Sequence, residues 1–399
     1  ALYPTQAFSQ VKYNQLNSWL YTELKAFLRA TLPEQDPDFP LIREFNRREL
    51  IPHRDRLIQK VRREFEQLPE GAQLRRRFQF ESLLNEMTDS ERRTQQRNLQ
   101  NLGHLLDQDF ISEKLRQSCL MRSHENVFRS DYDYGLLDII MRYTQEKGLL
   151  RLPSIAAYYH AYHFLSDPDS PTHYAAFQRV LKEQSAAFTQ VALRELYLFA
   201  INYCIRQMNR GQQTLAKEAL SLYRRGLEQH IFTDNGFLSP HTYRNAAALG
   251  LSLKEFDWTE QFIHEWGQKL EKEQRQKLLH YNLARLAYAR GLPDQALEEL
   301  RYVKTRDTLF TLSMEVFRAK IYYECDDHDL LDHHLEKVSI YLRRNNGSYH
   351  FQHYQNFVKY CRKLLRLSPF ATDERAHLKT AIQDEQVLTE KKWLLQQLS

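Results

Sequence analysis

The chain has 399 residues, of which 42% are hydrophobic and 27% charged, with a formal net charge of +5. The hydrophobic content is enough to build a core, which excludes wholesale disorder, and the balanced charge lacks the one-sided field of a dedicated nucleic-acid binder. No stretch reaches the roughly 18 apolar residues of a membrane-spanning helix, and residues 1–10 lack a signal-peptide pattern, so we expect a cytoplasmic protein.

The first predicted element is an amphipathic helix over residues 13–30, because large apolar residues recur there at steps of three and four. An arginine-rich region follows from Leu41 to Met87, with glutamates interleaved among its basic residues. If the arginines share one helical face they could follow nucleic-acid phosphates, with Arg75, Arg76 and Arg77 as the central candidates. If they alternate with the glutamates they form a solvated face held by ion pairs, the interpretation that we favour.

Long helices are predicted between residues 95 and 147, where no proline occurs. We assign residues 1–150 to an N-terminal helical region with non-repeat or degenerate repeat sequence. Whether it continues the superhelix of the following residues stays open. The chain starts at Ala1 rather than at a methionine, and the sequence also leaves open whether it belongs to a longer protein.

From residue 151 onward the helix punctuation becomes regular. Ser239 followed by Pro240 predicts a helix start, and Gly211 and Gly291 stand where helices should end. These signals predict helices of about 12 to 20 residues joined by short turns. Because alternating β-type patterns are absent, we predict an all-α protein without a β-sheet. The layout indicates an α-solenoid of antiparallel helical hairpins, with repeats over residues 151–345 and capping helices over 346–399.

The clearest repeat unit covers residues 279–303. It resembles the tetratricopeptide repeat at five positions. Leu283 and Ala284 match the large and small pair of the first helix, and Gly291 matches the turn between the helices. Ala296 matches the small contact residue of the second helix, and Leu300 the large residue after it. Weaker copies flank it within residues 190–345. The whole-chain layout, with its closing segment 349–398, is similar to a group of uncharacterised bacterial helical-repeat proteins. These resemblances imply stacked helical hairpins, and they imply no enzymatic activity.

Three features could carry other chemistry. His328 and Asp329 form the dipeptide used by helical metal-dependent phosphohydrolases, but nothing fixes the further His and Asp that such enzymes need, and we favour a solvated acidic turn. His160 and His163 share a helical face that could bind a ligand, although a seam between helices is the commoner use of such a face. The four cysteines lack ligand spacing and are expected to be reduced thiols in or near the core.

Neither a nucleophile elbow nor a phosphate-binding loop occurs in the sequence, so we expect a non-enzymatic protein without a cofactor or metal. The favoured function is an interaction scaffold that binds a peptide or helix of a partner protein on a solenoid groove. The alternatives are a regulator that contacts nucleic acid through the arginine-rich helices and, less favoured, a metal-dependent hydrolase. Repeat register selects eight candidate groove residues: Tyr243, Arg244, His280, Tyr281, Arg285, Tyr288, Phe317 and Lys320.

Overall fold

A computed structural model describes residues 9–31, 36–67, 69, 73–91, 98–128, 130–169, 171–344, 350–368 and 371–398. These residues are mostly α-helical, which confirms the predicted all-α class. Within the described ranges, no helix is both long enough and apolar enough to cross a membrane. The chain divides into two compact units, Ala1–Leu215 and Ala216–Ser399. The predicted boundaries at 150 and 345 concern repeat type and stay predictions; residues 345–349 lie outside the described ranges.

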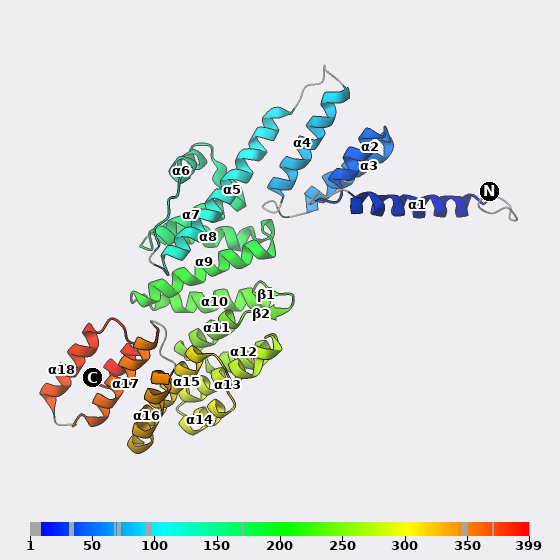
Figure 1. Cartoon of the computed structure of the whole chain (residues 1–399). Helices are drawn as coiled ribbons and strands as arrows, with labels where there is room; N and C mark the ends of the chain where they lie inside the picture. Colours follow the sequence, from blue (N-terminus) through cyan, green and yellow to red (C-terminus); the bar gives the residue numbers. More distant parts are fainter. Residues whose placement is uncertain are drawn as a thin grey trace. The chain divides into compact units, whose positions relative to one another are not determined.

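The first unit is built from nine helices in the part of the chain that is described (Figure 1), with 3₁₀ turns at Leu149–Arg151 and Ser185–Ala187. The helices are α1 (Gln10–Thr31), α2 (Phe39–Arg47), α3 (Ile51–Gln67), α4 (Leu74–Glu91), α5 (Leu99–Glu125), α6 (Leu137–Glu146), α7 (Pro153–Ser166), α8 (Pro171–Glu183) and α9 (Gln190–Asn209). The helix predicted over 13–30 is therefore present as α1, although Trp19 and Phe27 on it are exposed. Helices α2, α3 and α4 share one core, and α7 packs against α5, α8 and α9.

The second unit contains α10 (Thr214–Glu228), α11 (Pro240–Ser252), α12 (Phe256–Gly267), α13 (Lys272–Ala289), α14 (Pro293–Arg301), α15 (Thr308–Glu324), α16 (His328–Arg344), α17 (His350–Arg366), α18 (Thr372–Asp384) and α19 (Lys391–Gln396). Along the sequence, α11 packs on α12, α13 on α14, and α15 on α16. Helix α13 also contacts α11, and α17 contacts α15. Antiparallel hairpins thus lie beside their sequence neighbours in this unit.

One β-hairpin contradicts the prediction that the chain has no sheet. Strands β1 (Thr233–Asp234) and β2 (Phe237–Leu238) pair antiparallel between α10 and α11. Asn235 and Gly236, the two residues of the turn, both have positive φ, at 49° and 83°. An Asn-Gly pair in this conformation is a strong two-residue hairpin signal, and it is found here without the long alternating strands that the prediction required.

The helix ends in the second unit follow the sequence signals. Ser239 caps α11, since its side chain accepts a hydrogen bond from the Thr242 amide at 3.2 Å, and Pro240 occupies the first turn. Asp307 caps α15 in the same way, accepting from the amides of Leu309 and Phe310. Gly291 has a φ of 77° after the end of α13, a conformation that an L side chain disfavours. These caps fix where each hairpin turns.

Small residues allow the hairpin helices to approach closely. Ala284 and Ala296, from α13 and α14, are completely buried, as is Leu300. Gly250 on α11 has the same role, because a methyl group added there would meet the Thr259 hydroxyl and come within 3.0 Å of the Trp258 ring on α12. The small residues at these crossings are therefore required by the packing.

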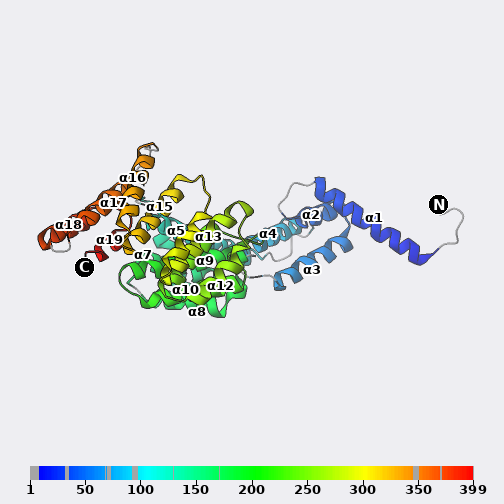
Figure 2. The same cartoon turned by 90° about the horizontal axis from the view of Figure 1, so that it is seen from below.

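The closing helices share a core with the preceding hairpin. Helices α15, α16 and α17 contact one another (Figure 2), and α19 contacts both α17 and α18. Trp393 and Leu394 of α19 are buried in the core that includes Leu312 and Val316 of α15. The chain from α17 to α19 thus returns to α15. The loop between α18 and α19 therefore lies near α15.

Candidate ligand-binding cavity in the second unit

A cavity of about 490 Å³ opens in the second unit. Its walls come from α11, α13, α15 and α17 and from the loop between α18 and α19. The lining residues are Arg244, Asn245, Ala248, Leu251, Ser252, Tyr281, Arg285, Tyr288, Ala289, Ser313, Val316, Phe317, Lys320, Tyr354, Thr389 and Glu390. The volume is within the range of roughly 300–1,000 Å³ that is typical of binding pockets.

Helical spacing explains why three of the walls are continuous. Each of α11, α13 and α15 contributes residues three, four or seven positions apart, which lie along one stripe of a helix. On α13, for example, Tyr281, Arg285 and Tyr288 follow this spacing. Each of these three helices is the first helix of a hairpin. The second helix of that hairpin packs on a different face of the first, which leaves this stripe free to line the cavity.

The structure brings six of the eight candidate groove residues to this cavity: Arg244, Tyr281, Arg285, Tyr288, Phe317 and Lys320. Tyr243 and His280 are absent from its lining, which corrects their predicted placement. Tyr243 is completely buried, and its hydroxyl donates to the Ile263 carbonyl at 2.8 Å. His280 Nδ1 lies 2.7 Å from Glu299 Oε2 on α14. Tyr243 and His280 each come one position before a lining residue of the same helix. One residue corresponds to a rotation of about 100° around the helix axis, so these two side chains point into the hairpin instead of the cavity.

Several lining residues were missed by the sequence interpretation. Ser252 and Ser313 follow the same stripes as the predicted residues, so helical register could have found them. Tyr354 and Glu390 come from the closing segment, which lies far along the chain. No local pattern indicates that this segment returns to α15, so only tertiary structure identifies these two residues.

Positive charge predominates in the cavity. Arg244, Arg285 and Lys320 line it together with a single carboxylate, that of Glu390. Lys320 Nζ lies 2.8 Å from Glu390 Oε2, and its side chain is only 15% exposed. The guanidinium carbon of Arg285 lies 5.9 Å from the centroid of the Tyr281 ring, within the range of a cation–π contact.

Tyr281 and Tyr288 are neutral hydrogen-bonding groups of the cavity. Burial raises the pKa of Tyr281 above its ordinary value, although the nearby charges of Arg285 and Arg244 lower it. Burial also raises the pKa of Tyr288, and its hydrogen bond to Glu324 raises it further. The Tyr288 hydroxyl donates to Glu324 at 2.6 Å, and Trp393 Nε1 donates to the other oxygen of that carboxylate at 2.6 Å. Glu324 thereby holds α13, α15 and α19 together beside the cavity.

The histidine pair predicted as a seam on α7 is joined by a third histidine from α8. His160 Nδ1 and His173 Nδ1 are 2.9 Å apart, and the rings of His163 and His173 stack with their centroids 4.0 Å apart. Burial, with a smaller effect from neighbouring imidazoles, lowers the pKa of His160 and His163 to about 4. Burial also lowers the pKa of His173, so all three rings are neutral near pH 7, and one of the two facing Nδ1 atoms donates to the other.

The acidic turn around His328 and Asp329 holds a different arrangement from a metal centre. His328 lies 3.8 Å from Asp326, and His334 Nε2 donates to the Glu315 carbonyl oxygen at 2.8 Å. Across the residues that the structure describes, no three His, Cys, Asp or Glu side chains gather closely enough to hold a metal ion. The four cysteines are all free thiols; Cys119, Cys204 and Cys361 are buried as expected, whereas Cys325 is exposed.

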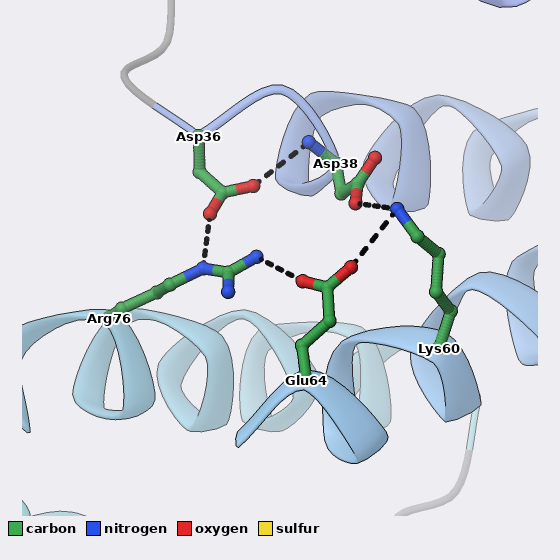
Figure 3. A network of polar contacts seen from close by, with 5 residues as sticks. All are labelled: Asp36, Asp38, Lys60, Glu64 and Arg76. Atoms are coloured by element: carbon green, nitrogen blue, oxygen red, sulfur yellow. Dashed lines mark hydrogen bonds and ion pairs between the residues drawn. The ribbon is translucent and has the colours of Figure 1, made fainter. Parts of the chain in front are cut away.

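The three consecutive arginines of the first unit contact other residues of the protein. Arg76 bridges Asp36 at 2.6 Å and Glu64 at 2.9 Å, and Lys60 joins Glu64 to Asp38 (Figure 3). Arg77 donates to the Phe65 carbonyl at 2.9 Å, and Arg75 lies 3.2 Å from Asp109. These contacts match the interpretation of an arginine-rich surface held by ion pairs more closely than that of a phosphate-binding face.

Comparisons with protein-family models, with curated proteins and with solved structures found no match to this chain.

Proposed function

We propose that this protein is a non-enzymatic, tetratricopeptide-like α-solenoid scaffold of the cytoplasm that binds a segment of a partner protein in the cavity of the second unit. The observation that carries the proposal is the cavity wall, formed by matching stripes of α11, α13 and α15. Successive first helices that present one continuous wall are the usual means by which helical-repeat proteins bind peptides.

The chemistry of the wall supports a peptide ligand. Aromatic rings of Tyr281, Tyr288 and Phe317 supply apolar contact area, and Arg244 and Arg285 supply hydrogen-bond donors. Aromatic residues and arginines are enriched at the centres of protein interfaces. A cavity of about 490 Å³ accommodates a few side chains, so we expect it to bind the anchor residues of an amphipathic or acidic segment.

The nucleic-acid alternative has less support. It was centred on Arg75, Arg76 and Arg77, and each of these side chains contacts an acceptor of the protein itself. Breaking these contacts would offset part of the energy gained from binding phosphate. We therefore place the partner-protein function first.

Affinity capture from the native lysate tests the proposed function when it is done with a cavity-blocking variant. Ala248 lines the cavity, so Ala248→Trp fills it. The control is Arg301→Gln on α14, where the side chain is 75% exposed. We expect a nuclease-resistant partner that the wild type and Arg301→Gln recover equally and that Ala248→Trp loses. Equal recovery by Ala248→Trp, or loss of the partner on nuclease treatment, would contradict the proposal.

A further inference from the structure

The charges within the cavity are only partly balanced by the protein itself. Glu390 pairs with Lys320 at 2.8 Å and neutralises it. Over the described part of the chain, no carboxylate lies within 4.0 Å of the guanidinium groups of Arg244 or Arg285. Two positive charges in one half-enclosed cavity therefore have no acidic partner among the described residues of this unit.

The two arginines line the same cavity as Tyr281. Their charges oppose the rise that burial causes in the pKa of Tyr281, and the Arg285 guanidinium contacts the Tyr281 ring. That ring is held in turn by Phe310 and Phe317, with centroid distances of 4.9 Å and 6.4 Å. A fixed aromatic support limits the rotamer entropy that an arginine loses when it binds a ligand, and its planar fork matches a carboxylate.

A second part of the cavity offers hydrogen-bond acceptors. Ser313 Oγ donates to the Leu309 carbonyl at 2.9 Å, so it must accept the hydrogen of Tyr354, whose oxygen is 3.0 Å away. With its proton used in this way, the Tyr354 hydroxyl offers lone pairs to a ligand. A peptide carries both an acidic side chain for the arginines and amide N–H groups for such acceptors. A bare anion carries only the first.

We propose that Arg244 and Arg285 form a subsite for a glutamate or aspartate side chain of the partner segment, with Tyr281 as its floor and with the Ser313–Tyr354 pair receiving an amide of the same segment. The inference rests on the proposed function. It narrows the partner to an acidic protein segment. A carboxylate of that segment would lie beside Arg244 and Arg285, where the described chain provides no carboxylate of its own.

The test measures binding of labelled peptides to the full chain by fluorescence anisotropy. The probes are a repeated Glu-Leu-Tyr peptide, its Gln-Leu-Tyr counterpart and a phosphoserine-Leu-Tyr counterpart. We expect the glutamate peptide to bind at least about tenfold more tightly than the glutamine peptide, a preference that high salt reduces. In the double variant Arg244→Gln with Arg285→Gln the preference should fall to about twofold or less, whereas Arg301→Gln should keep it. Circular dichroism of each variant checks that the helices are intact.

Four results would overturn the subsite, and the last of them would overturn the proposed function too. Equal binding of the glutamate and glutamine peptides, with both lost in Ala248→Trp, would leave peptide binding in the cavity but remove the carboxylate subsite. Stronger binding of the phosphoserine peptide than of the glutamate peptide would assign the arginines to phosphate. A glutamate preference that survives the double arginine variant would place the acidic contact elsewhere. Failure of all three probes to bind, together with unchanged lysate capture by Ala248→Trp, would contradict the proposed function as well.

Discussion

At the scale of single residues, the partly buried histidines of α7 and α8 have a lower pKa in the folded protein than in the unfolded chain. His160 and His163 have a pKa of about 4 in the folded protein, against about 6.5 for an ordinary histidine. Because the folded pKa is depressed, the unfolded chain binds protons first as the pH falls. The folded state is therefore favoured above about pH 6.5 and loses stability as the pH drops from there towards 4.

We predict that acidification destabilises the fold through this cluster. Between pH 7 and pH 5, the two histidines should reduce the free energy of unfolding by roughly 2 kcal/mol in all, after allowance for their partial exposure. Chemical denaturation at the two pH values measures this loss. In His163→Phe, which keeps the ring stacked on His173, the loss should be smaller than in the wild type. An identical pH dependence in this variant would show that other groups are responsible.

Two glycines on helices offer a matched test of packing. A methyl group at Gly250 would collide with Thr259, whereas Gly103 on α5 has open space where its Cβ would stand. We predict that Gly250→Ala lowers the free energy of unfolding by about 1–3 kcal/mol, because overpacking forces the helices apart. Gly103→Ala should instead raise it by up to about 1 kcal/mol, since alanine favours a helix more than glycine. Thermal unfolding followed by circular dichroism distinguishes the two, and a stable Gly250→Ala would disprove the close approach of α11 and α12.

At the scale of elements, a polar network joins the start of α2 to α3 and α4 in the first unit. Figure 3 shows Arg76 between Asp36 and Glu64, and Lys60 between Glu64 and Asp38. Asp38 is 3% exposed, and its carboxylate accepts a charge-compensating hydrogen bond from Lys60. The Arg76 guanidinium also lies 5.3 Å from the Phe65 ring centroid. The network thus orients three helices around the core that they share.

Removing the central cation should be far more costly than removing its neighbour. We predict that Arg76→Met lowers the free energy of unfolding by about 2–4 kcal/mol, because it leaves the largely buried carboxylate of Asp36 without its cation and leaves Glu64 with Lys60 alone. Arg75→Gln should change it by about 0.5 kcal/mol or less, since that side chain is 68% exposed. Urea denaturation of both variants measures the difference. Equal effects would mean that the network contributes no more than an ordinary surface ion pair.

Sequence patterns predicted the helices well where the turn chemistry is explicit. Ser239 and Pro240 begin α11, and Gly291 lies just beyond the end of α13, both as predicted. The Asn235–Gly236 hairpin was missed because its strands have only two residues each, too short for an alternating pattern to show. Helix prediction therefore succeeded through caps and periodicity, and failed where two residues decide the local structure.

At the scale of the whole molecule, the closing segment completes the cavity. Glu390, which has a positive φ of 54°, begins α19 and pairs with Lys320 of α15. Helical register selected six residues that lie on the stripes lining the cavity, but it could not reveal that a loop from the end of the chain supplies an acidic residue there. The charge available to a ligand thus depends on a contact between segments that are far apart in sequence.

We predict that Glu390→Gln strengthens binding of the repeated Glu-Leu-Tyr peptide by about three- to tenfold. The substitution frees the Lys320 ammonium group for the ligand and removes a carboxylate that repels it. Fluorescence anisotropy against the wild type measures the change, with the Gln-Leu-Tyr peptide as the control whose affinity should stay the same. Weaker binding in Glu390→Gln would indicate that the ion pair shapes the cavity rather than competing with the ligand.

The central claim, that the cavity of the second unit binds a partner protein, is tested most directly by photo-crosslinking in the native lysate. A benzophenone side chain in place of Ser252, an exposed residue of the cavity lining, would reach a bound segment without filling the cavity, and one in place of Arg301 would lie on exposed α14 as the control. We predict one predominant protein adduct from position 252 after nuclease treatment, joined through an acidic segment, and none of it from position 301. The same adducts from both positions, or none from position 252, would contradict the claim.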